Sequence, residues 1–66
     1  MRNNIIIERT KKDMTQKQLA GALGVTRQTI NAIEKNKYRP STLMALKMSN
    51  LFGLTVNALF VLEQGD

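Results

Sequence analysis

Three polar side chains near the middle of the chain have the shape and spacing to recognise a planar pattern of hydrogen-bonding groups. Arg27 and Gln28 are adjacent, and Asn31 follows Arg27 by about one helical turn. The guanidinium fork of arginine matches the two acceptors on the major-groove edge of guanine, and the glutamine amide matches the edge of adenine. The chemistry that these residues offer is therefore recognition of base edges.

The segment 16–35, with the sequence QKQLAGALGVTRQTINAIEK, must position these side chains. Its apolar residues recur at helical spacing on one face of two short stretches, as Leu19, Ala20 and Leu23 and then as Ile30 and Ile33. Gly24 stands between the two stretches and tolerates the left-handed backbone of a tight turn. Two helices joined in this way, with polar groups on the outer face of the second, are typical of a helix-turn-helix.

Catalytic residues are hard to find in this sequence. It contains no histidine and no cysteine, and its five carboxylates are scattered at positions 8, 13, 34, 63 and 66. No glycine-rich phosphate loop follows a predicted strand. We therefore expect no enzyme activity, no metal site, no cofactor and no small-molecule ligand.

The length of 66 residues predicts one domain over residues 1–66. Without cysteine or histidine, neither a disulfide nor a usual zinc site can stabilise it, which makes dimerisation attractive on physical grounds. No signal peptide or bilayer-spanning apolar run is evident. The expectation is a cytoplasmic protein without a membrane partner.

Positive charge is concentrated in the first part of the chain. The net charge is +5, with nine basic and three acidic side chains in residues 1–40 and one basic and two acidic side chains in residues 41–66. Many small proteins are basic, so the charge alone decides little. Next to the motif of residues 16–35, the asymmetry favours a nucleic-acid partner.

Capping residues precede four helical segments, at Thr15, Thr26, Ser41 and Thr55. Gln18 completes the pattern of a capping box at the first of them. The helix that begins at Thr26 is expected to end near Lys35, and the next is expected to end at Gly53. The last helix is expected to carry Val56, Leu59, Phe60 and Leu62.

The first ten or so residues allow two interpretations. A helix over residues 3–12 with Asn3 or Asn4 as its cap is the first. Consecutive isoleucines at positions 5–7 suit a strand as well as a helix. An extended arm of residues 1–6 that pairs with another segment is therefore the alternative.

The stretches MTQKQLAGALGV, TRQTINAIEKNKYRPS, MALKMSNLFG and TVNALF together resemble the Cro/repressor (XRE-like) family of helix-turn-helix transcriptional regulators. The resemblance covers about residues 9–60. It implies an all-α, five-helix fold of the lambda-repressor type, in which helices two and three form the helix-turn-helix, and a bacterial, archaeal or phage origin. The sequence departs from the family at Glu8, where an apolar residue is usual.

In a helix-turn-helix the second helix lies in the major groove of DNA with its N-terminal residues at base edges. We therefore predict base contacts by five residues of this helix, which are Arg27, Gln28, Asn31, Thr26 and Ala32. We predict phosphate contacts by seven further residues, which are Gln16, Lys17, Thr29, Lys35, Asn36, Lys37 and Tyr38. The ring of Tyr38 has an alternative place against the fourth helix.

The resemblance also implies roles for particular residues. Gln16 matches a glutamine that binds a phosphate and steadies a recognition side chain in similar proteins. Arg9 and Glu34 match the positions of an ion pair between the first and third helices, which orients the reading helix. These two residues are expected to be structural, because Glu34 would repel DNA phosphates.

The end of the chain carries more apolar residues than one short exposed helix accommodates. We predict a two-fold dimer interface at about residues 54–62, formed by Leu54, Val56, Leu59, Phe60, Val61 and Leu62. Burial of these residues within the monomer is the alternative.

Two functions from different classes remain. The first is sequence-specific binding of double-stranded DNA by a homodimeric regulator, a repressor that occupies a pseudo-palindromic operator. The second is an antitoxin or adaptor that uses the same fold for contact with another protein. The polar and basic residues on one face of the third helix favour the first.

Overall fold

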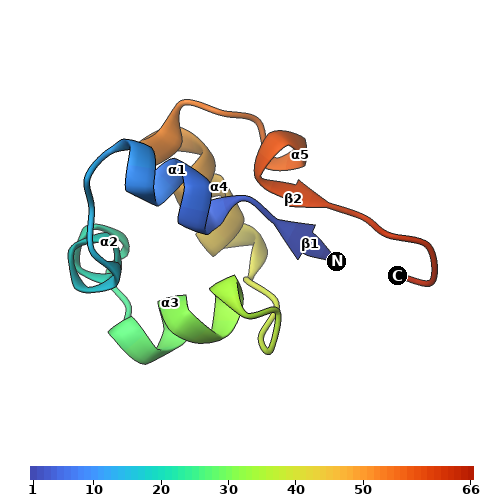
Figure 1. The fold of residues 1–66 in the computed structure, drawn as a ribbon, viewed down its shortest axis with the longest axis horizontal. Coiled ribbons are helices and arrows are strands. Elements are labelled where there is room, and N and C mark those ends of the chain that lie inside the picture. Colours follow the sequence, from blue (N-terminus) through green and yellow to red (C-terminus); the bar gives the residue numbers. More distant parts are fainter.

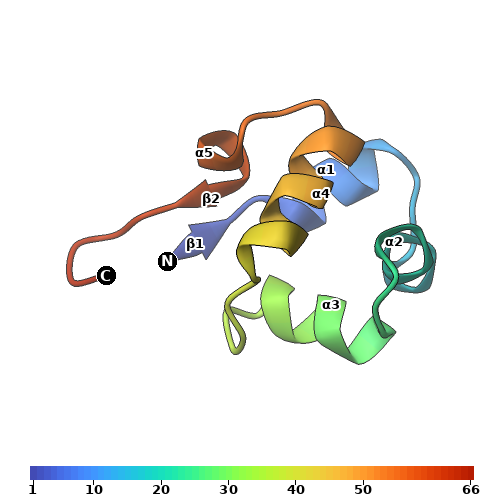
Figure 2. The ribbon, with the colours of Figure 1, turned by 180° about the vertical axis from the view of Figure 1, so that it is seen from behind.

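The computed structural model describes residues 1–66 as five short helices with a small antiparallel sheet at one end (Figure 1 and Figure 2). The elements in chain order are β1 (Arg2–Asn3), α1 (Ile5–Lys11), α2 (Gln16–Leu23), α3 (Arg27–Glu34), α4 (Thr42–Phe52), α5 (Val56–Leu59) and β2 (Phe60–Val61). Both views place α2 at the end of the molecule opposite the sheet and the two chain termini. The predicted five-helix fold is confirmed.

No helix in the structure combines the length and the apolar character that a membrane span requires.

Side-chain caps begin four of the helices, as predicted. Thr15 and Gln18 form a complete capping box, in which each side chain bonds the backbone N–H of the other at 2.9–3.0 Å. Three further hydroxyl groups, those of Thr26, Ser41 and Thr55, accept the backbone N–H three residues on. These bonds satisfy amide groups that lack a partner within the helix and fix where each helix begins.

Two glycines end helices in the left-handed conformation that a side chain disfavours. Gly24 follows α2 with φ of 74°, and Gly53 follows α4 with φ of 66°. The turn at Gly24 directs the chain from α2 into α3, so the predicted helix-turn-helix connection is present.

One apolar core joins all five helices and β2. Its ten buried residues are Ile5, Leu19, Ala20, Leu23, Ile30, Ile33, Met48, Phe52, Leu59 and Phe60. Of the three consecutive isoleucines only Ile5 reaches the core, while Ile6 and Ile7 are about half exposed. Successive residues of a helix point about 100° apart, so one of three neighbours faces inward.

The predicted boundaries of the first helix were wrong at the N-terminal end. Residues 2–3 form β1 and pair antiparallel with β2, so that Arg2 lies opposite Val61 and Asn3 opposite Phe60. This pairing corresponds to the extended arm that the sequence allowed as an alternative. It joins residues almost sixty positions apart, and a local pattern cannot reveal such a partner.

Asn4 stands at the N-cap position of α1 but its side chain does not cap that helix. Its amide Nδ2 donates to the carbonyl of Ala58 at 3.0 Å, and its backbone N–H donates to the carbonyl of Leu59 at 2.9 Å. Asn4 therefore satisfies carbonyl groups at the end of α5, which is only four residues long.

The last predicted helix was too long. It ends at Leu59, and Phe60 continues as a strand with φ of −122° and ψ of 125°. Pairing with β1 satisfies the backbone of Phe60 while its ring remains in the core. The chain can therefore change from helix to strand without losing the burial of the aromatic ring.

Ion pairs connect the two ends of the chain. The α-amino group of Met1 lies 2.8 Å from a carboxylate oxygen of Asp66, and the guanidinium of Arg39 lies 3.4 Å from the other oxygen. The hydrogen bond between Met1 and Asp66 raises the pKa of the amino group and lowers the pKa of the Asp66 carboxyl.

The predicted ion pair between Arg9 of α1 and Glu34 of α3 is present, with Nε and Oε2 separated by 2.8 Å. The side chains are only 16% and 2% exposed, respectively. A second guanidinium nitrogen of Arg9 donates to the carbonyl of Met14 at 2.9 Å. The pair is therefore sheltered, and one guanidinium holds α1, the α1–α2 turn and α3 together.

Loss of Arg9 will leave the buried carboxylate of Glu34 without its counter-charge. We predict that Arg9→Met lowers the free energy of unfolding by about 3 kcal/mol, measured by urea titration. Lys11→Met serves as the matched control, because Lys11 pairs with Glu8 at an exposed site, and its loss is expected to cost less than about 0.5 kcal/mol. Equal losses in the two variants would contradict this role for Arg9.

Gly21 lies inside α2 at an exposed position, and an added Cβ would meet no atom within 4 Å. Gly21→Ala should therefore stabilise the protein by about 0.5–1 kcal/mol, since alanine has the higher helix propensity. A rise in the thermal midpoint of several degrees would report this gain. Gly24→Ala should instead destabilise the protein, because alanine is strained at the positive φ of this position. A stabilised Gly24→Ala variant would contradict this prediction.

Candidate nucleic-acid interface

The outer face of α3 carries the predicted reading side chains. Arg27 and Gln28 are exposed in the first turn of this helix, while Ile30 and Ile33 on its opposite face are buried in the core. The apolar anchors fix the rotation of α3 about its axis. The first turn of the helix therefore presents its polar groups to solvent, and the protein's own interior covers neither of them.

Gln16, the first residue of α2, connects the two helices of the motif through its amide group. Its Oε1 accepts from Nη1 of Arg27 at 3.1 Å. Its Nε2 donates to Oδ1 of Asn31 at 3.2 Å and to Oε1 of Glu34 at 2.8 Å. The structure thus brings together two predicted base-contacting residues, one predicted phosphate-contacting residue and the buried carboxylate of the ion pair.

The remaining predicted base-contacting residues are placed differently. The hydroxyl of Thr26 accepts from the backbone N–H of Thr29 at 3.2 Å and lies 3.0 Å from the hydroxyl of that residue. Both threonines therefore take part in the cap of α3. Ala32 is half-buried on the same helix.

The C-terminal end of α3 is closed by Asn36, which adopts the left-handed conformation with φ of 59°. The N–H groups of Asn36 and Lys37 donate to the carbonyls of Ile33 and Ala32 at 3.0 and 2.8 Å, which is the Schellman pattern. Asparagine tolerates this conformation better than most residues. Asn36 therefore has a structural role in addition to its predicted phosphate contact.

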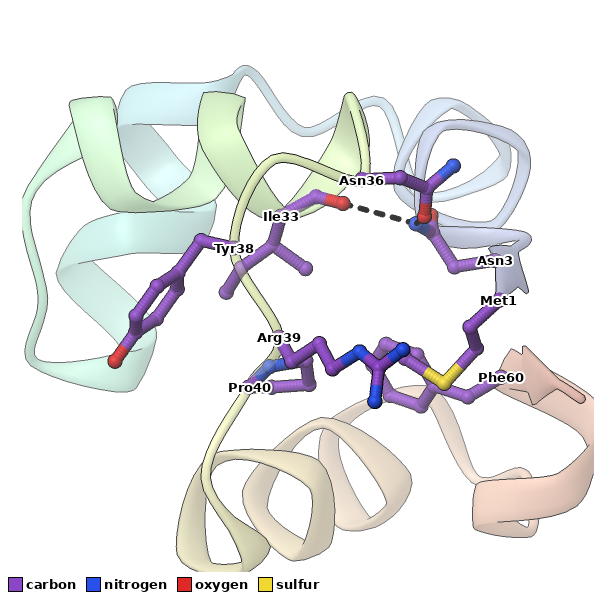
Figure 3. Close-up of a pocket in the computed structure, with 8 residues that line it drawn as sticks. All are labelled: Met1, Asn3, Ile33, Asn36, Tyr38, Arg39, Pro40 and Phe60. Atoms are coloured by element: carbon purple, nitrogen blue, oxygen red, sulfur yellow. Dashed lines mark hydrogen bonds between the residues drawn. The ribbon is translucent and has the colours of Figure 1, made fainter. Parts of the chain in front are cut away.

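A side chain from the N-terminal strand braces the same helix end. Nδ2 of Asn3 donates to the carbonyl of Ile33 at 2.9 Å and to Oδ1 of Asn36 at 3.0 Å, beside a small cavity of about 80 Å³ (Figure 3). The only role predicted for Asn3 was that of a helix cap. The long-range pairing of β1 brings this residue to α3, and no local signal marks it.

The loop after α3 carries exposed basic and aromatic groups. Lys35 and Lys37 are exposed, and Lys17 of α2 is exposed as well. Tyr38 is 55% exposed, and in Figure 3 its ring points away from Met1 and Phe60. More than half of the Tyr38 side chain is therefore accessible for an external contact.

The residues of the predicted dimer interface divide into two groups. Leu59 and Phe60 are buried in the core of the monomer, so for these two the alternative of internal burial is the correct one. Leu62 is 78% exposed, and the other three, Leu54, Val56 and Val61, are half-buried. Two more exposed leucines, Leu43 and Leu46 of α4, lie outside the predicted interface.

Comparison with known proteins agrees with this geometry. Residues 5–59 match the protein family described as Helix-turn-helix. The chain is 42% identical over 66 residues to an uncharacterized HTH-type transcriptional regulator of Methanocaldococcus jannaschii, with full coverage of both chains. It is 41% identical over 64 residues to an uncharacterized HTH-type transcriptional regulator of Bacillus subtilis, with 97% of each chain covered.

A third relative, an uncharacterized HTH-type transcriptional regulator of Archaeoglobus fulgidus, is 41% identical over 66 residues, which are 100% of this chain and 94% of the relative. The family match spans α1 to α5 and so includes both helices of the helix-turn-helix. The chain belongs to the XRE-type helix-turn-helix family of DNA-binding transcriptional regulators.

Proposed function

We propose that this protein binds double-stranded DNA sequence-specifically as a homodimer and represses transcription by occupying a pseudo-palindromic operator. The observation that carries the proposal is the open first turn of α3, where Arg27 and Gln28 are exposed above a helix anchored by Ile30 and Ile33. A helix held in this way enters the major groove with its N-terminal residues at base edges.

Sequence recognition is assigned to the side chains of α3. Arg27 donates to guanine O6 and N7, and Gln28 pairs with adenine. Asn31 reaches a base or a phosphate from one turn further along the helix. Weaker contributions come from Thr26, through its hydroxyl, and from Ala32, through a thymine methyl.

Phosphate contacts fix the position of α3 in the groove without reading sequence. Lys35 and Lys37 follow α3, and Lys17 lies in the first turn of α2, where the free backbone N–H groups also favour an anion. The remaining candidates are Gln16, Thr29, Asn36 and Tyr38. If about five phosphates are neutralised per subunit, the log–log dependence of affinity on salt has a slope of about −9 for a dimer.

The dimer is assigned to the apolar surface at the end of the chain. Leu62 is the most exposed large apolar residue, and Val56, Leu54 and Val61 are half-buried beside it in sequence. Two copies related by a two-fold axis can place their α3 helices in successive major grooves, about 34 Å apart.

Contact with a protein partner is the second candidate function, as in an antitoxin or adaptor. Exposed leucines at positions 43, 46 and 62 favour it, because exposed apolar groups often mark sites of protein contact. Selection of bound duplexes from a random pool distinguishes the two functions. Enriched palindromic sites support DNA recognition, whereas no enrichment and no dependence on salt support the protein-binding role.

Two substitutions should separate recognition of bases from contact with phosphates. Arg27→Ala is expected to lose about 1–3 kcal/mol of discrimination at one base pair of each half-site, because it removes a bidentate donor. Lys37→Ala is expected to weaken binding to all sequences alike and to reduce the salt slope. Quantitative gel shifts on the selected site and its single-base variants measure both effects. A changed consensus in Lys37→Ala, with an unchanged one in Arg27→Ala, would reverse the assignment.

A charged residue at the proposed interface should dissociate the dimer. We expect sedimentation at micromolar concentration to show twice the monomer mass of 7.4 kDa for the unmodified chain and the monomer mass for Leu62→Asp, since two carboxylates would meet across the two-fold axis. Ile7→Asp, at another exposed apolar position on α1, is the control that should remain dimeric. A monomeric unmodified chain would remove the dimer from the proposal.

A further inference from the structure

Glu34 faces two different partners from its buried position behind α3. Its Oε2 accepts from Nε of Arg9 at 2.8 Å, and its Oε1 accepts from Nε2 of Gln16 at 2.8 Å. The contact between Oε1 and Nη2 of Arg9 is longer, at 3.4 Å. One carboxylate oxygen therefore serves mainly the ion pair, and the other serves the amide that connects α2 to the reading residues.

A carboxylate accepts hydrogen bonds and cannot donate them. The amide of Gln16 must therefore turn its NH₂ group toward Glu34 and its oxygen toward the outside. The outward Oε1 accepts from Nη1 of Arg27 at 3.1 Å, and the second proton of the NH₂ group is directed to Oδ1 of Asn31 at 3.2 Å. The orientation of the Gln16 amide thus determines which hydrogen-bonding groups of Arg27 and Asn31 remain free for an external partner.

The groups that remain free on Arg27 and Asn31 are donors. Arg27 carries only N–H groups, and Asn31, whose oxygen is bonded to Gln16, keeps its own NH₂ group for an external acceptor. Guanine presents two acceptors in the major groove, and phosphate oxygens are acceptors too. A bidentate contact of Asn31 with adenine would need its oxygen as well, so this contact is disfavoured.

We propose that Glu34 is a positioning residue for DNA recognition, which acts through the amide of Gln16 to make Arg27 and Asn31 meet the DNA as donors. The inference rests on the proposed function and deepens it by naming the residue that orients the Gln16 amide to which Arg27 is bonded. Glu34 contacts no base, and its ion pair with Arg9 remains the structural part of its role.

Glu34→Gln tests the proposal, because it keeps the shape of the side chain and adds a donor. The oxygen of the new amide stays with the guanidinium of Arg9, which can only donate. Its NH₂ group then faces Gln16, whose amide must turn over and present N–H to Arg27. We expect discrimination for the preferred base pair under Arg27 to fall by about tenfold in competition gel shifts.

Two further variants separate positioning from stability. Gln16→Met removes the amide, so adding Glu34→Gln to it should change discrimination no further, although stability falls in both backgrounds. Arg9→Lys weakens the ion pair but leaves the acceptor-only carboxylate in place, so it should lower stability and keep discrimination. The proposal is overturned if Glu34→Gln leaves discrimination unchanged, or if it lowers discrimination equally in the Gln16→Met background.

A measurement without DNA keeps failure of this proposal distinct from failure of the proposed function. Rotation of the Arg27 guanidinium, followed by ¹⁵N NMR of the free protein, should be slow in the unmodified chain and fast in Glu34→Gln and Gln16→Met. Arg2, an exposed arginine of β1, supplies the freely rotating reference. If Arg27 rotates as fast as Arg2 in the unmodified chain, the positioning role is refuted even where DNA is bound. If rotation is slow but no sequence is selected, the DNA-binding proposal fails instead.

Discussion

A buried carboxylate is the constraint on which the rest of the interface depends. Removal of the charge of Glu34 from water is costly unless hydrogen-bonding partners replace the water. Arg9 supplies the opposite charge from α1, and Gln16 supplies an amide donor from α2. The need to satisfy this one group therefore connects three helices and determines how α2 and α3 face each other at the candidate DNA-binding surface.

Local signals in the sequence predicted most of the helical framework. The hydroxyl caps at Thr15, Thr26, Ser41 and Thr55 and the glycines that end α2 and α4 act within a few residues, so their patterns could be read directly. The pairing of β1 with β2 could not be predicted from such local patterns, because the paired residues are almost sixty positions apart. The last helix was predicted to continue past Leu59 to Leu62 for the same reason: helical spacing of apolar residues does not reveal where strand pairing takes over.

For the candidate site, residue types were predictable and their mutual orientation was not. An arginine in the first turn of the second helix of a helix-turn-helix indicates base recognition regardless of the residues around it. Which atom of the Gln16 amide points outward depends on Glu34, eighteen residues later in the chain, and on the position of α3 against α2. The bracing of α3 by Asn3 is also a product of tertiary structure. Both are hydrogen-bond relations in three dimensions, which sequence spacing does not encode.

The network also bears on the energetics of recognition. A free arginine loses side-chain entropy when it is ordered at an interface, and this loss opposes binding. In the free protein Nη1 of Arg27 is already bonded to Gln16, so part of this loss occurs on folding. The entropy cost of ordering Arg27 is therefore offset within the monomer. The ion pair of Arg9 and Glu34 and the apolar core behind α3 stabilise the ordered side chains. A domain with only ten buried apolar residues thus uses polar contacts both to hold its helices and to order the exposed side chains of its proposed reading surface.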